Sequence, residues 1–280
     1  MNFKKTVLRQ LLASALSGLW PFLPLVAQTD SLHTLPEVSI RDFLPPETGY
    51  ADRFSDSLPT SGISTLSERL LLEFPIALRA NGPGALATLS ARGAGPSRTA
   101  IFWQGLNLQS PMNGVVDAAL LPLWPNDQIA YRPGGQSATQ SSGAMGGALY
   151  LLPSLRFDST APRRQIGCSI GSFERQNAYG SLVLGGDKFN SLLRGSWRQA
   201  ENDFPFKNTT LIGAPERRQA NSRTENLDLQ HYTVQKLGEK NRLETAFWLQ
   251  RAFREIPPAM TEAPDQTWQR DRATRAVLRW

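Results

Sequence analysis

Beyond Arg163 the sequence alternates between apolar and polar residues over long segments. In KFNSLLRGSWRQ the apolar residues Phe189, Leu193 and Trp197 fall on one face of an extended strand and the polar residues on the other, with Leu192 as the exception. RLETAFWLQR shows the same alternation. Because successive side chains of a β-strand point to opposite faces, the pattern predicts antiparallel strands with one apolar and one polar face.

The connections between these segments are alternately short and long. The tight turns GGD (185–187) and GEKN (238–241) alternate with long polar loops, which we expect at Glu201–Ser222 and Glu255–Asp271. Short turns at one end of the strands and long loops at the other are typical of outer-membrane β-barrels, whose strands need only about ten residues. A soluble β-sandwich also alternates, so periodicity alone leaves both architectures open.

Residues 61–152 have a different texture and predict a compact mixed α/β unit. Thr65 to Glu68 reads T-L-S-E, a capping box that predicts a helix ending before Pro75. DAALLPL predicts a helical turn. Short strands are expected in ALATLSARG, RTAIFWQGLNL, DQIAYRPGG and GGALYLL.

The glycine cluster in SSGAMGGALYLL (141–152) does not form a nucleotide-binding motif. Such a motif needs G-x-G-x-x-G opening a helix, or a P-loop with its lysine, and this cluster precedes a strand. Gly93 and Gly95 fail the same test, because Arg98 occupies the third glycine position. We therefore expect no nucleotide site.

Charge, cysteine and histidine content exclude several other functions. The net charge is +6, but Lys and Arg are spread without a dense run, so nucleic acid is not an expected partner. The single Cys168 permits no internal disulfide, and His33 and His231 lie far apart without other metal ligands at binding spacing. No metal site, cofactor or catalytic residue is predicted, and the chain is not expected to be an enzyme.

The N-terminus predicts export. Residues 1–27 carry Lys4, Lys5 and Arg9 before an apolar run and a small residue, Ala27, near its end, as in a cleaved signal peptide. A membrane anchor is a weaker interpretation because prolines interrupt the run, which is shorter than the roughly 20 residues needed to span a bilayer.

Residues 28–62 are rich in Pro, Ser, Thr and Asp and predict a flexible arm. Within the arm, TLPEVSI (34–40) is a short extended patch, which could pair with the exposed sheet edge of a partner. A plain linker remains the alternative on local evidence.

Residues 98–151 resemble the plug domain of the TonB-dependent receptors of Gram-negative outer membranes, in RTAIFWQGLNLQSPMNGVVDAALLPLWPNDQIAYRPGGQSATQSSGAMGGALYL. GSFERQNAYGSLVLGG and ENDFPFKN are similar to the first barrel hairpin and second outer loop of such receptors common in Bacteroidetes. TLPEVSI then resembles the TonB box. The chain departs from the family pattern at Gln104, Pro133 and Gln140.

The resemblance implies a mixed α/β plug domain followed by antiparallel transmembrane β-barrel strands. The implied domains are a signal peptide (1–27), an arm with the TonB box (28–62), a plug (63–155) and barrel strands (156–280). Family barrels have about 22 strands around a plugged lumen, whereas about six fit here. The barrel is thus expected to be incomplete and the chain to be an N-terminal piece of a longer receptor. The family pattern also makes 143–151 the last plug strand, where glycines allow close backbone packing.

The resemblance further implies import of a scarce nutrient complex, such as an iron chelate (siderophore) or cobalamin. The implied partners are TonB, outer-membrane lipid and the extracellular ligand. A passive outer-membrane receptor or adhesin, or a soluble secreted β-rich module, are the alternatives. The TonB-coupling residues would be Leu35, Glu37, Val38, Ser39 and Ile40. The ligand-facing plug residues would be Asn81, Gly82, Gly84, Asn107, Gln109 and Asn113. Arg92 and Arg132 match plug arginines that face barrel glutamates, which would lie beyond Trp280.

Overall fold

The structure is a computed structural model that describes residues 53–55, 62–73, 76–125, 127–134, 143–153, 163–238, 241–262 and 266–280. The predicted signal peptide and TonB box, including Leu35, Glu37, Val38, Ser39 and Ile40, lie outside these residues. No helix in the described part of the chain is long and apolar enough to cross a membrane.

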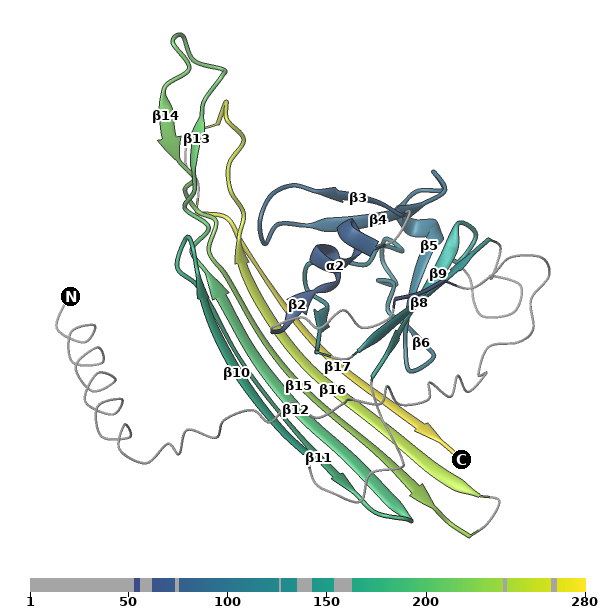
Figure 1. The fold of residues 1–280 in the computed structure, drawn as a ribbon. Coiled ribbons are helices and arrows are strands. Elements are labelled where there is room, and N and C mark those ends of the chain that lie inside the picture. The colour runs from purple at the N-terminus through teal and green to yellow at the C-terminus, as the bar shows by residue number, and fades with distance from the viewer. Residues whose placement is uncertain are drawn as a thin grey trace, which may run out of the picture. The chain divides into compact units, whose positions relative to one another are not determined.

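The first half of the chain contains a five-stranded sheet with the strand order β1-β8-β9-β5-β6 (Figure 1). Its members are β1 (Arg53–Ser55), β5 (Thr99–Trp103), β6 (Leu106–Asn107), β8 (Gln128–Pro133) and β9 (Gly147–Leu152). Only the β5–β9 pairing is parallel among the pairings of this sheet. The strands predicted in this region are therefore confirmed. Strand β1 differs, because it lies within the predicted flexible arm and gains its hydrogen-bond partner from distant β8.

Two small strand pairs and one helix complete this unit. Strands β2 (Ser64–Thr65) and β7 (Pro122–Leu123) pair with each other, as do β3 (Ile76–Ala80) and β4 (Ala87–Ala91). A single 3-10 turn, η2 (Pro96–Arg98), precedes β5.

The helix α2 (Leu66–Glu73) begins at the predicted capping box. The Thr65 N–H donates to Glu68 Oε2 at 2.9 Å, and the Glu68 N–H donates to Thr65 Oγ1 at 3.2 Å. Each side chain thus satisfies a backbone donor that the helix leaves unpaired, which confirms the predicted start of this helix. Its last residue is Glu73, so the helix ends before Pro75 as predicted.

DAALLPL is a turn that leads into a strand. The Leu120 N–H donates to the Asp117 carbonyl at 3.2 Å, which closes one turn, and β7 follows directly. The prediction of a turn is confirmed, but β7 was missed, because two residues are too few to show a period of two.

The glycine cluster brings backbone close to backbone. A Cβ at Gly146 would lie 2.6 Å from Ala94 Cβ and 2.8 Å from the Ala91 carbonyl oxygen. A Cβ at Gly147, where φ is +146°, would lie 2.9 Å from the Arg132 carbonyl oxygen. Only glycine fits here without displacement, so the expected close packing at the approach to β9 is confirmed.

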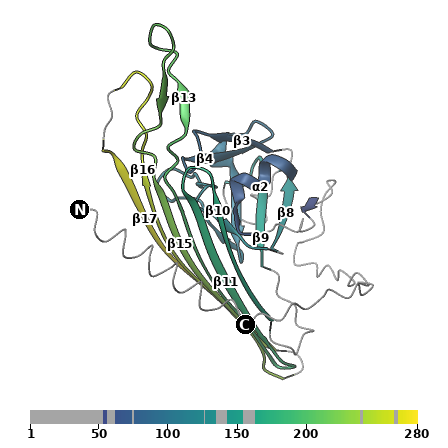
Figure 2. The ribbon, with the colours of Figure 1, turned by 60° about the vertical axis from the view of Figure 1, so that its left-hand side comes forward.

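The rest of the chain forms a six-stranded antiparallel sheet with the order β10-β11-β12-β15-β16-β17. Its strands are β10 (Arg163–Gly171), β11 (Arg175–Gly185), β12 (Phe189–Ala200), β15 (Thr224–Lys236), β16 (Arg242–Glu255) and β17 (Trp268–Arg279). Each strand pairs with its neighbours in this sequence, as in an up-and-down barrel that is not closed among the described strands. The sheet is curved, and the plug elements lie against its concave face (Figure 1, Figure 2).

The connections follow the predicted alternation. The turns after β11 and β15 are short, whereas the loop from residue 201 to 223 carries a small hairpin of β13 (Pro205–Lys207) and β14 (Glu216–Arg218). The second loop covers 256–267 and is shorter than predicted, because β17 already begins at Trp268. Hereafter the "loop end" of the sheet is the end that carries these two loops.

The two faces of the sheet have opposite character. On the concave face Arg194, Arg198 and Asp228 are buried, while on the outward face Phe189 and Leu193 are exposed. The sheet is therefore polar where it faces the plug and apolar where it faces away. Leu192, the exception in the sequence pattern, joins the concave face, where it packs into the hydrophobic core shared with the plug.

Candidate functional site

The plug–strand interface brings plug residues 117–127 against the concave face of β12, β15, β16 and β17. Three polar groups of this plug segment each receive side-chain donors from the strands: the carboxylates of Asp117 and Asp127 and the carbonyl of Leu120. The three contacts lie along one short stretch of chain, so together they fix its position against the sheet.

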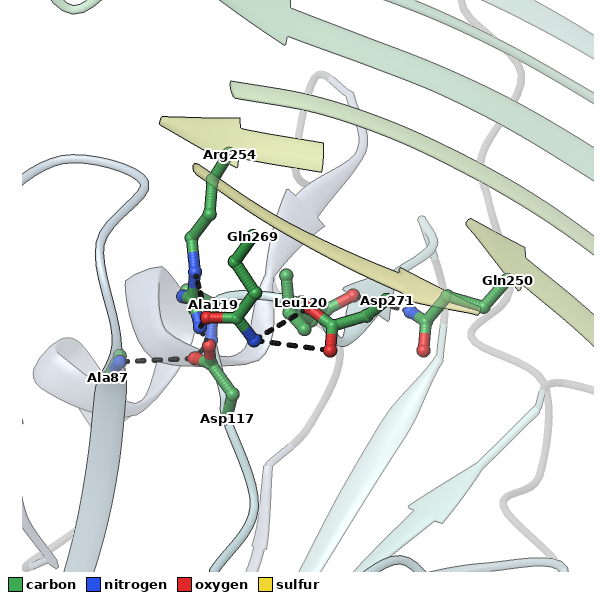
Figure 3. Close-up of polar contacts among 8 residues, drawn as sticks. All are labelled: Ala87, Asp117, Ala119, Leu120, Gln250, Arg254, Gln269 and Asp271. Atoms are coloured by element: carbon green, nitrogen blue, oxygen red, sulfur yellow. Dashed lines mark hydrogen bonds and ion pairs between the residues drawn. The ribbon is translucent and has the colours of Figure 1, made fainter. Parts of the chain in front are cut away.

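Asp117 is held by Arg254 of β16 (Figure 3). The Arg254 Nη1 donates to Asp117 Oδ2 at 2.6 Å, and both side chains are about nine-tenths buried. The other carboxylate oxygen accepts the N–H groups of Ala87 and Ala119 at 3.1 and 3.0 Å. Gln269 of β17 accepts two further N–H groups of Arg254. The charge of Asp117 is therefore compensated from both the plug and the strands.

Leu120 offers its carbonyl to the strands through a buried network around Asp228. The Gln250 Nε2 donates to the Leu120 carbonyl at 2.8 Å and to Asp228 Oδ1 at 3.0 Å (the first contact is drawn in Figure 3). Asp228 also accepts from Arg198 at 3.3 Å and from the Trp248 indole at 3.0 Å. The buried carboxylate thus orients the donors that reach the plug.

Asp127 forms an ion pair with Arg194 of β12. The Arg194 Nη1 donates to Asp127 Oδ1 at 2.7 Å, and the side chains are 5% and 7% exposed. Arg194 also donates to Gln230 and Tyr232, and its guanidinium lies 5.0 Å from the centre of the Trp124 ring. The stability of an ion pair buried this deeply depends on all of its partners, because a buried charge without a partner is strongly unfavourable.

Aromatic contacts reinforce the same interface. The Trp103 indole of the plug donates to the Tyr232 hydroxyl at 2.7 Å, and its ring centre lies 5.3 Å from that of Trp248. The guanidinium carbon of Arg275, on β17, lies 4.3 Å from the centre of the Trp248 ring.

The sequence pattern predicted that Arg194 and Arg198 lie on the polar face of a strand, but it showed no partner for them. Their partners lie 67 and 30 residues away, a separation that no local pattern reveals.

Three of the predicted ligand-facing residues lie in a pocket at the loop end. Asn81, Gly82 and Gly84 form the connection from β3 to β4. A Cβ at Gly84 would lie 2.6 Å from Thr224 Cγ2, so this loop touches the start of β15. The loop pocket is lined by Asn81, Gly82, Pro83, Gly84, Ala85, Phe204, Gln219, Ser222, Thr224, Glu255 and Pro257. Plug loop and strand loops thus meet in one place.

The other three predicted residues lie elsewhere and bind their own loop and the neighbouring η2 turn. The Gln109 Nε2 donates to the carbonyls of Ser97 and Gly114 at 2.9 and 2.8 Å, and Asn107 donates to Gln109. Asn113 accepts the Val115 N–H at 3.1 Å. These residues do not line the loop pocket, and their contact with a ligand stays a prediction.

The two predicted plug arginines do not take part in the plug–strand contacts given above. Arg132 lies on β8 with 1% of its surface exposed, 5.8 Å from the centre of the Tyr150 ring. Arg92 occupies the turn after β4 with a positive φ of 53°. Their predicted pairing with barrel glutamates beyond Trp280 stays a prediction. In the contacts given above, it is strand arginines that hold plug carboxylates.

Among the described residues, no group of three His, Cys, Asp or Glu side chains could hold a metal ion.

Comparisons with known proteins agree with this geometry. Residues 54–148 match the family model of the TonB-dependent Receptor Plug Domain. No curated protein matches the chain. In fold the chain is similar to the copper transporter OprC, with a TM-score of 0.58 and 15% identity over 73% of this chain and 31% of that one.

Two further solved structures show the same similarity. The siderophore receptor PirA from Acinetobacter baumannii has a TM-score of 0.54 and 15% identity, over 72% of this chain and 31% of its own. The FrpB iron transporter from Neisseria meningitidis has a TM-score of 0.52 and 16% identity, over 71% of this chain and 30% of its own. The chain spans about a third of the length of these proteins.

Proposed function

Residues 54–148 belong to the plug-domain family of the TonB-dependent receptors, and from that premise we propose that the chain is part of a receptor that imports a scarce nutrient complex across the outer membrane. The observation that carries the proposal is the plug–strand interface, in which buried charges and aromatic rings hold a plug on the polar face of the sheet. The opposite face is apolar and exposed, as a lipid-facing surface requires.

The ligand class that we propose is an iron chelate of the siderophore type or cobalamin. The fold is shared with a siderophore receptor and an iron transporter, which supports the first. A copper transporter has the same fold, so the fold does not select one nutrient. We place ligand contact at the loop pocket, where the predicted Asn81, Gly82 and Gly84 meet the strand loops. No covalent step is proposed.

The energetics of the interface explain why import needs an external energy source. Asp117 and Asp127 are both buried in ion pairs with strand arginines, and separating such a pair without resolvation is costly. The plug therefore stays in place when a ligand merely binds outside. We propose that TonB supplies the force by pairing with residues 35–40 of the arm. The sequence of this segment predicts an extended strand, and Pro- and Asp-rich segments flank it.

A substitution in the TonB box tests this function. Val38→Pro removes one backbone donor from the pairing strand and bends it, so cells with the full-length receptor should still bind ligand but should no longer import it. Ser39→Ala is the matched control and should leave uptake unchanged, because backbone atoms make the contacts. The measurement is uptake and surface binding of labelled ferric siderophores and cobalamin by cells lacking other importers.

The alternative functions predict different results in the same assay. Normal import by the Val38→Pro cells would remove the TonB-box assignment and favour a passive receptor or adhesin. If the Val38→Pro cells lost ligand binding and uptake together, that result would also remove the TonB-box assignment and favour a passive receptor or adhesin. Recovery of the protein in the periplasm or medium, instead of the outer membrane, would favour a soluble secreted module, against which the apolar outward face argues.

A further inference from the structure

Three arginines gather on the outward face of β16 and β17, near the loop end of the sheet. Arg251 and Arg272 are direct partners in the strand register. Arg270 lies two residues before Arg272 and is the next outward residue toward the loop end. All three are exposed. Ala252 and Arg254, which alternate with Arg251 along β16, are buried on the concave face. The three arginines therefore lie on the outward face. We name Arg251, Arg270 and Arg272 the arginine cluster.

Aromatic rings hold one member of the arginine cluster in place. The Arg270 guanidinium carbon lies 5.4 Å from the centre of the Trp268 ring and 5.9 Å from that of Phe253. The two ring centres are 6.2 Å apart. Such cation–π contacts restrict the guanidinium to the ring faces while its N–H groups remain available to an acceptor.

The arginine cluster carries charge that the described residues do not neutralise. Like charges directly opposite on antiparallel strands repel, and Arg251 and Arg272 are such a pair. The described part of the chain shows no ion pair to any member of the cluster. Two carboxylates share this face, but Glu225 pairs with Arg223 at 3.3 Å and Glu255 accepts the Arg223 N–H at 3.0 Å.

The surroundings of the arginine cluster define the kind of anion that it fits. Toward the short-turn end, the same face exposes Leu229, Phe247 and Leu249. At the loop end it carries Trp268, more than half exposed, together with the arginines. A change from purely apolar side chains to a tryptophan beside cationic ones is typical of the boundary between hydrocarbon and headgroups.

We propose that the arginine cluster binds the phosphate groups of an anionic lipid headgroup, in the membrane leaflet at the loop end of the strands. Guanidinium groups match phosphate because their parallel N–H groups donate to two oxygens at once. A bound phosphate would also relieve the repulsion between Arg251 and Arg272. The proposal rests on the membrane location proposed above but not on import, so a receptor that transports nothing would still bind this lipid.

Lipid binding to the full-length protein in nonionic detergent tests the proposal. Native mass spectrometry during titration with phosphatidylglycerol or zwitterionic phosphatidylcholine would give the two affinities. Phosphatidylglycerol should bind more tightly. The triple variant Arg251→Gln, Arg270→Gln, Arg272→Gln should lower that affinity on the order of a hundredfold, from the contribution of three interfacial charges. Its affinity for phosphatidylcholine should fall much less, because the choline cation offsets the charge of the phosphate in that headgroup.

The matched control removes the same charge from exposed positions elsewhere. Lys188→Gln, Lys207→Gln, Arg217→Gln should leave phosphatidylglycerol affinity as in the wild type. Equal losses in both triple variants would overturn the proposal, because net charge and not the cluster would then decide binding. Displacement of the lipid by inorganic phosphate at matched phosphate concentration would also overturn it, in favour of a site for a soluble anion.

A single substitution separates lipid binding from a structural role. Without anionic lipid, Arg272→Gln should raise the thermal midpoint, because it removes the repulsion from Arg251. Saturating phosphatidylglycerol should raise the thermal midpoint of the wild type more than that of the variant. The difference between the two midpoints should therefore shrink or reverse. A variant whose midpoint is lowered equally with and without lipid would show a structural role and would overturn the proposal.

Discussion

Arg194 is the residue at which the contacts between plug and strands converge. It pairs with Asp127, donates to Gln230 and Tyr232, and covers the Trp124 ring. The carboxylate and the guanidinium are both almost fully buried, so each depends on the other for the solvation that water no longer gives. A single residue of the strand thus holds both a charge and a ring of the plug.

Arg194→Met should weaken the attachment of the plug strongly. The substitution keeps much of the volume but leaves Asp127 buried without its partner, a change that costs about 3–5 kcal/mol. Unfolding of the full-length receptor in detergent, followed by tryptophan fluorescence, measures the loss. The double variant Arg194→Met, Asp127→Leu should recover much of it. Arg218→Gln is the control, since its exposed pair with Asp203 is worth at most about 1 kcal/mol.

Equal losses in the buried and the exposed arginine variants would contradict this account, because burial would then not set the strength of the pair. If the double variant Arg194→Met, Asp127→Leu were as unstable as Arg194→Met alone, that result would also contradict this account.

At the scale of elements, β9 shows how tightly the plug strands are packed. The approach to this strand passes the turn after β4 so closely that Gly146 leaves no room for a side chain. Its N–H donates to the Arg98 carbonyl at 2.9 Å, which ties the approach to the start of β5. The parallel pairing of β5 with β9 begins directly beside this contact, at Thr99 and Gly147.

Gly146→Ala should destabilise the plug, because the added methyl group would meet a Cβ and a backbone oxygen that cannot both give way. We expect a cost of about 1–3 kcal/mol, the usual range for overpacking. Gly180→Ala in β11 is the control, since the nearest atom to a Cβ there is 3.8 Å away. Thermal unfolding of both variants in detergent checks the difference, and a Gly146→Ala midpoint equal to that of Gly180→Ala would refute the close packing.

At the scale of the molecule, the loop end gathers parts from distant regions of the chain. The plug loop at Gly84 touches Thr224, and the two strand loops bind each other through Asn208, which donates to the Met260 carbonyl at 3.1 Å. Asn221 donates to the carbonyls of Ile256 and Thr267, both at 2.8 Å. The loops at this end are therefore ordered by contacts with each other.

An epitope tag inserted after Ile212 should be stained on intact cells that carry the full-length receptor. We propose that the plug sits at the periplasmic entrance of the barrel, so that the first barrel strand runs outward and the loop end is extracellular. Ile212 is fully exposed at the tip of the loop, whereas Asn208 is buried and bonded, so the tip tolerates insertion better. The same tag in the short turn after Gly186 should be stained only after permeabilisation. The reverse staining pattern would invert the topology.

The sequence by itself determined what depends on neighbouring residues. The capping box at Thr65, the two-faced strands and the alternating turns and loops follow from local hydrogen bonds and from side-chain period, and the structure has them where they were predicted. The length of β17 was underestimated at its start, where Trp268 to Asp271 were assigned to the long polar loop.

Only the tertiary structure decided which residues meet across the chain. β1 and β7 are too short to be predicted, and they exist because β8 and β2 lie beside them. In the sequence Asp117 opens a predicted helical turn and Asp127 a predicted strand, with no partner nearby. Their function in the interface comes from strand arginines that follow far along the chain. Burial makes these pairs matter, and burial is a property of the packed molecule, which no stretch of the sequence contains by itself.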